Sequence, residues 1–63
     1  MALTSKELSW IEDQLTLEQL LIKKYRDASK SADDAAIAGK MASIAERHEK
    51  HYNTLFKHLN TLG

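Results

Sequence analysis

The sequence predicts an all-α protein, an antiparallel helical hairpin that forms a four-helix bundle as a homodimer. The chain has 63 residues, no proline and only two glycines, so little in it opposes helix formation. One short polar segment divides it into two long amphipathic stretches. Both stretches carry more apolar surface than one neighbouring helix can cover, and a second copy of the chain would bury the surplus.

The first helix is expected over about residues 4–29. Thr4-Ser5-Lys6-Glu7 has the spacing of a capping box, in which a hydroxyl and a glutamate satisfy each other's end amides. At about 100° per residue, two apolar stripes lie side by side on this helix. The first stripe is Leu8, Ile11, Leu15, Ile22 and Tyr25, and the second is Trp10, Leu17 and Leu21. Together they exceed the arc of about 100° that one antiparallel partner covers.

A turn is expected at about residues 30–33 and a second helix at about 34–60. Asp33 and Asp34 suit the positive N-terminus of that helix. Gly39 lies inside it and is expected to let the two helices approach closely. The apolar face is Ile37, Met41, Ile44, Leu55, Leu59 and Leu62, broadened by Ala38, Ala45, Tyr52 and Phe56. Because the turn is short, the helices must be antiparallel neighbours.

Two-fold pairing of two hairpins is expected to bury the surplus apolar surface, since two-fold dimers are the commonest closed oligomers. The expected dimer interface is Trp10, Leu17, Leu21, Tyr52 and Phe56, with Trp10 as an anchor. Chain length points the same way, because 63 residues are close to the lower limit for a self-sufficient core.

Composition argues against several classes of function. Nine basic and nine acidic residues give zero net charge, which does not indicate a nucleic-acid surface. No run approaches the roughly 18 apolar residues of a membrane span, and no secretory leader is visible, so an intracellular protein is expected. Without cysteine, neither a disulfide nor a thiolate zinc site is available. No phosphate loop or activated nucleophile is recognisable, and we do not expect an enzyme.

Three polar residues interrupt the apolar seams. Glu18 lies in the middle of the first stripe, where a carboxylate is costly to bury alone. His48 lies centrally on the seam of the second helix, and His51 lies toward its edge. In an antiparallel hairpin with a rise of about 1.5 Å per residue, Glu18 is level with His48 and His51 lies one turn further on. The polar residues of both helices therefore meet at one level.

Two interpretations of this cluster remain open. In the first, Glu18 accepts a hydrogen bond from His48 or His51, and the buried pair specifies register and partner. In the second, the three side chains are ligands for iron, manganese or zinc, and two-fold symmetry brings six such ligands together.

The remaining polar candidates are expected to be peripheral. His58 should be partly exposed near the end of the second helix, and Glu46 and Glu49 should be solvated. Tyr25 and Tyr52 should lie at the edge of the core, with their hydroxyls reaching water or a polar partner.

Three segments of the chain resemble the short coat F type spore coat proteins of endospore-forming bacteria. They are residues 9–15 (SWIEDQL), 18–25 (EQLLIKKY) and 44–55 (IAERHEKHYNTL). That family is similar to one half of the ferritin-like fold, whose di-iron members carry a glutamate on one helix and a Glu-x-x-His pair on the next. The resemblance matches Glu18 to the first glutamate and His51 to the histidine. His48, however, stands where that pattern has glutamate, which disfavours a carboxylate-bridged di-iron oxidase.

The resemblance implies a structural or assembly protein of the spore coat, which associates with itself and with other coat proteins. The alternative is a metal-binding, ferritin-like bundle that holds iron, manganese or zinc through Glu18, His48 and His51.

Overall fold

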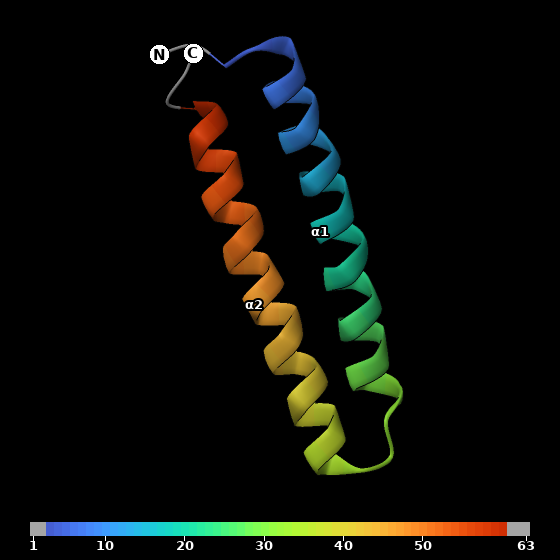
Figure 1. The fold of residues 1–63 in the computed structure, drawn as a ribbon. Helices are drawn as coiled ribbons and strands as arrows, with labels where there is room; N and C mark the ends of the chain where they lie inside the picture. Colours follow the sequence, from blue (N-terminus) through green and yellow to red (C-terminus); the bar gives the residue numbers. More distant parts are fainter. Residues whose placement is uncertain (1–2, 61–63) are drawn as a thin grey trace.

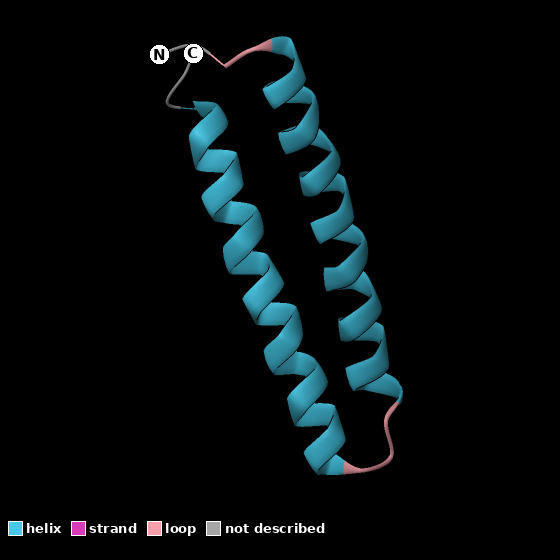
Figure 2. Ribbon diagram, viewed as in Figure 1, coloured by secondary structure: helices cyan, strands magenta, loops and turns pink. Residues whose placement is uncertain are grey.

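The computed structural model describes residues 3–60, which form two helices joined by a short loop (Figure 1, Figure 2). Helix α1 runs over Ser5–Ser31 and helix α2 over Ala35–Asn60. The helices lie side by side and antiparallel, with the loop at one end (Figure 1). The predicted all-α hairpin is thus confirmed for the described part of the chain. Leu62, which was expected on the apolar face of the second helix, lies outside the described residues. Helix α1 ends two residues later than the sequence suggested.

Local side-chain hydrogen bonds fix the helix ends. The Thr4 hydroxyl accepts from the Glu7 N–H, and the Glu7 carboxylate accepts from the Thr4 N–H, each at 3.0 Å. The predicted capping box is therefore confirmed. Donation from the Thr4 backbone and hydroxyl lowers the pKa of Glu7. Extended backbone at Ala32 ends α1, and Asp34 Oδ1 accepts from the Ile37 N–H at 3.0 Å to cap α2.

The layer between the helices is thin. Among the residues whose burial is described, Ala45 is the only buried apolar residue, at 2% exposure. The radius of gyration is 14.6 Å, whereas roughly 10.6 Å is expected for a compact chain of this length. The accessible surface is 4967 Å², whereas a compact 7.1 kDa protein exposes roughly 4,100 Å². The hairpin is an extended rod with little interior of its own.

Gly39 does not lie between the helices. A Cβ built on Gly39 would meet no atom within 4 Å. The reason is its rotation of about 120° from Ala45 around α2, which directs position 39 away from α1. The expectation that this glycine lets α1 approach closely is wrong.

The contacts along one edge of the hairpin are polar. Arg26 of α1 forms an ion pair with Glu49 of α2, and Glu49 is half-buried. The expectation that Glu49 is solvated is therefore wrong, because a rotation of only about 40° separates it from the buried Ala45. Glu46 is exposed, as expected. No helix within residues 3–60 combines the length and apolar character needed to cross a membrane.

Candidate metal centre and the exposed apolar face

Glu18 is the most deeply buried polar residue among those described. It is 4% exposed and lies at the centre of α1. Its two carboxylate oxygens are engaged by different helices. Oε1 accepts a hydrogen bond from Gln14 Nε2, one turn earlier in α1, at 2.9 Å, and Oε2 lies 2.7 Å from His48 Nδ1 in α2. Burial of this carboxylate is therefore compensated at both oxygens.

His48 is held from both sides. Its ring stacks on Tyr25, with centroids 5.9 Å apart and an interplanar angle of 12°. The ring of His51 meets it edge-on, with centroids 5.7 Å apart. Tyr25 is half-buried, as expected of a residue at the edge of the core. These contacts fix the plane of the His48 imidazole and direct Nδ1 toward Glu18.

His51 completes the cluster from a more open position. Its Nδ1 lies 3.9 Å from Glu18 Oε1, too far for a hydrogen bond, and its side chain is 55% exposed. A shallow pocket opens beside it and is lined by Gln14, Glu18, His51, Thr54 and Leu55. The cluster is therefore closed toward α1 and accessible at His51.

The three side chains offer one carboxylate oxygen and two imidazole nitrogens, all within 4.8 Å of one another. Ligands of a tetrahedral zinc ion, with bonds of about 2.0–2.1 Å, lie roughly 3.3 Å apart. The Glu18–His48 separation of 2.7 Å is shorter, as suits a direct hydrogen bond. The Glu18–His51 separation of 3.9 Å is longer. Because the three donor atoms are separated by up to 4.8 Å, side-chain shifts of about 1–1.5 Å would be needed to convert the cluster into a ligand set.

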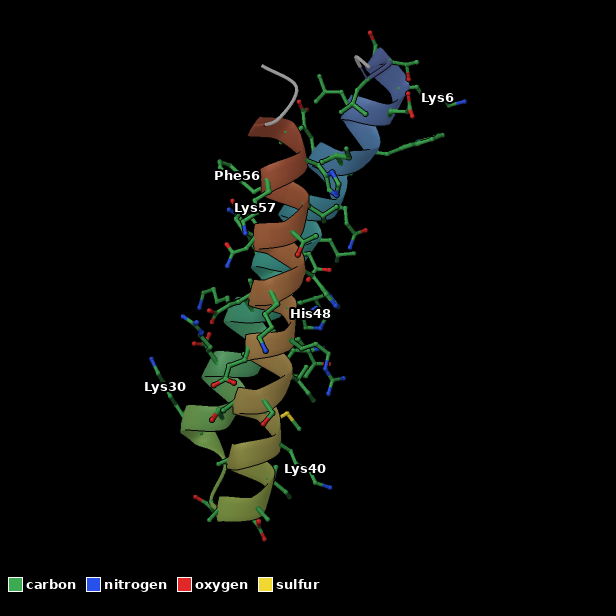
Figure 3. All side chains as sticks on the ribbon, turned by 90° about the vertical axis from the view of Figure 1, so that its left-hand side faces the viewer. Lys6, Lys30, Lys40, His48, Phe56 and Lys57 are labelled. Carbon is green, nitrogen blue, oxygen red and sulfur yellow. The ribbon has the colours of Figure 1, made fainter. Side chains whose placement is uncertain are left out.

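The predicted interface residues divide between two faces. Lys6 Nζ lies 5.5 Å from the centre of the Trp10 ring, and Lys6 projects on the same side of the hairpin as His48 (Figure 3). Leu17 and Leu21 are rotated from Glu18 toward the side of Trp10. Phe56 projects on the opposite side in Figure 3. We call the surface around Trp10, Leu17, Leu21 and His51 the cluster face.

Tyr52 does not belong to the cluster face. It stacks on Phe56 with centroids 6.1 Å apart, and its hydroxyl accepts a hydrogen bond from Gln19 Nε2 at 3.2 Å. Trp10 and Phe56 therefore project on different sides of the hairpin. The expected interface of Trp10, Leu17, Leu21, Tyr52 and Phe56 stays a prediction.

His58 is exposed, as expected near the end of α2. Gln14 was not recognised as part of the cluster from the sequence. Its spacing of four residues before Glu18 is the signal that could have identified it, since such residues are neighbours on a helix.

No protein-family model matches this chain, and no curated protein or solved structure matches it either.

Proposed function

We propose that this protein is a self-associating structural module in which two hairpins pair through their cluster faces to form a four-helix bundle. The observation that supports the proposal is exposed apolar surface: Trp10 is 60% exposed and Leu17 is 47% exposed. The accessible area exceeds the compact value by roughly 900 Å², close to the roughly 800 Å² that each partner buries in a standard interface.

The position of the polar cluster also favours pairing. Glu18 is the central residue of the 27-residue α1, and His48 lies at the middle of the 26-residue α2. Two hairpins that overlap over their whole length about a two-fold axis must align their midpoints, whether the axis runs along the bundle or across it. The two clusters then lie at the same level, and a residue pair that is buried there specifies the register.

Sedimentation equilibrium across a range of protein concentrations tests this proposal. A self-associating module gives twice the chain mass at micromolar concentration and dissociates on dilution. A single species of one chain mass over the whole range would reject it.

The resemblance to coat F type spore coat proteins suggests the spore coat as the setting, with other coat proteins as further partners. Purified spores provide the test. The protein should be recovered from the coat fraction of a spore-forming source and be scarce in vegetative cells, and the reverse distribution would remove this part of the proposal.

The second candidate function is a metal centre for iron, manganese or zinc, favoured by the convergence of Glu18, His48 and His51. Imidazole and carboxylate donors suit these metals, and the aligned clusters of a dimer would supply four histidines and two glutamates. Protein purified without chelator should contain metal, and added Zn²⁺ should raise the melting temperature, since a ligand that binds only the native state stabilises it. Less than about a tenth of an equivalent per dimer together with an unchanged melting temperature would exclude it.

A further inference from the structure

The Glu18 carboxylate can face His48 and His51 together only in a narrow range of rotation about its terminal bond. Oε2 must stay beside His48 Nδ1, at 2.7 Å, while Oε1 points toward His51 Nδ1, at 3.9 Å. Terminal carboxylate rotations are broad and have little intrinsic preference. A further contact on the oxygen that faces His51 would restrict the group to this orientation.

Gln14 provides that contact. Its Nε2 donates to Oε1 at 2.9 Å, on the oxygen that faces His51. Gln14 also lines the pocket beside His51. Its position one turn before Glu18 lets the amide reach the carboxylate along the helix surface.

The residue type matters as much as the position. A carboxamide donates through its nitrogen and adds no charge, so it satisfies Oε1 and leaves a single anionic group in the cluster. A glutamate at position 14 would place a second carboxylate beside the first, and a leucine would leave Oε1 without a donor. A ligating carboxylate that is oriented by an outer hydrogen bond binds metal better than one that is free to rotate.

We propose that Gln14 is the positioning residue of this centre, fixing the Glu18 carboxylate so that one oxygen serves His48 and the other faces His51. The ligand that benefits is a divalent metal ion held by the three side chains, so the inference rests on the metal-binding candidate function. The carboxylate has this orientation in the metal-free protein as well, so the positioning role of Gln14 can be tested separately from metal binding.

The experiment compares Gln14→Leu with Gln19→Leu. Gln19 is the matched control, because it is a glutamine of the same helix and donates to Tyr52 rather than to Glu18. Co²⁺ is the probe, since its visible absorption reports ligand number and geometry. We expect Gln14→Leu to weaken Co²⁺ binding by about tenfold or more and to alter the cobalt spectrum, as removal of an outer-shell partner typically does. Gln19→Leu should leave both unchanged.

Metal-free protein gives the second readout. In NMR spectra, Gln14→Leu should shift the Glu18 carboxyl carbon and the ring nitrogens of His48, whereas Gln19→Leu should shift neither. Circular dichroism checks that each variant is folded. If Gln14→Leu is unfolded, Gln14→Met, which has an unbranched side chain, replaces it.

The outcomes are distinct. If the wild type binds no Co²⁺, the metal function fails, and the metal-free spectra alone decide the role of Gln14. If Gln14→Leu leaves the Glu18 and His48 signals at their wild-type positions, or if it binds Co²⁺ with wild-type affinity and spectrum, the positioning role is refuted.

Discussion

Leu17 offers the sharpest test of the proposed interface. The side chain is 47% exposed in the single hairpin and lies on the cluster face. Full burial of a leucine contributes about 1.5–3 kcal/mol, so covering the exposed half contributes about 1 kcal/mol per copy. A two-fold dimer buries it twice, and Leu17→Gln should cost about 2 kcal/mol of association, or about thirtyfold in the dissociation constant.

Leu8 supplies the matched control. It is a leucine of the same helix and is 39% exposed, but it lies nine residues before Leu17, which places it about 180° from Leu17 around α1 and so away from the cluster face. Leu8→Gln should change the dissociation constant by less than about threefold, because its side chain lies outside the proposed interface. Sedimentation equilibrium measures both variants. Equal effects of the two substitutions, or an unweakened Leu17→Gln dimer, would refute the choice of interface.

The remaining predictions concern the cluster, α2 and the helix cap. Glu18→Gln should lower the free energy of unfolding by about 1–3 kcal/mol, because the single amide oxygen cannot replace both carboxylate oxygens and one of the donors, Gln14 or His48, loses its acceptor. Glu18→Leu should destabilise the protein less, or even stabilise it. Chemical denaturation that ranks the two variants the other way would contradict this. Gly39→Ala should stabilise the helix by about 0.5–1 kcal/mol, since a methyl group there meets open space, and a lower melting temperature would indicate that position 39 is covered in the assembly. The lowered pKa of Glu7 means that its cap stabilises the folded state above the unfolded pKa of about 4.3 and loses that effect as pH falls through the folded value. The stability difference between wild type and Glu7→Gln should therefore close in acid, and a constant difference across that range would count against the cap.

Much of the fold could be predicted because its signals are local. The capping box at Thr4 and Glu7 needs only the spacing of two residues, and the absence of proline leaves two uninterrupted helical stretches. The rise per residue and an approximate turn position predicted that Glu18 and His48 lie at the same height along the hairpin, and the two side chains do meet. Where a structural feature is determined within one helix, the sequence is sufficient to predict it.

Predictions that depended on rotation between two helices were less reliable. Gly39 was placed between the helices on composition alone, although its angle from Ala45 directs it outward. Phe56 and Trp10 were assigned to one interface from the apolar stripes of each helix taken separately, whereas the two residues project on opposite sides of the hairpin. The ion pair between Arg26 and Glu49 joins residues from both helices, so neither helix alone reveals it.

The candidate site shows the same division. Residue types and spacing identified Glu18, His48 and His51, but they could not show that Gln14 occupies one carboxylate oxygen. Nor could they distinguish the hydrogen-bonded separation of 2.7 Å at His48 from the open 3.9 Å at His51. Those distances depend on how side chains of two helices settle against each other, and helical periodicity does not contain that information.

The mass of the protein in dilute solution tests most directly whether the hairpin needs a partner. Analytical ultracentrifugation of the unmodified chain from about 1 to 100 μM, the range in which a modest interface dissociates, should give a dimer that falls apart on dilution. A well-folded particle of one chain at every concentration, with the Trp10 fluorescence of a water-exposed indole, would contradict the account.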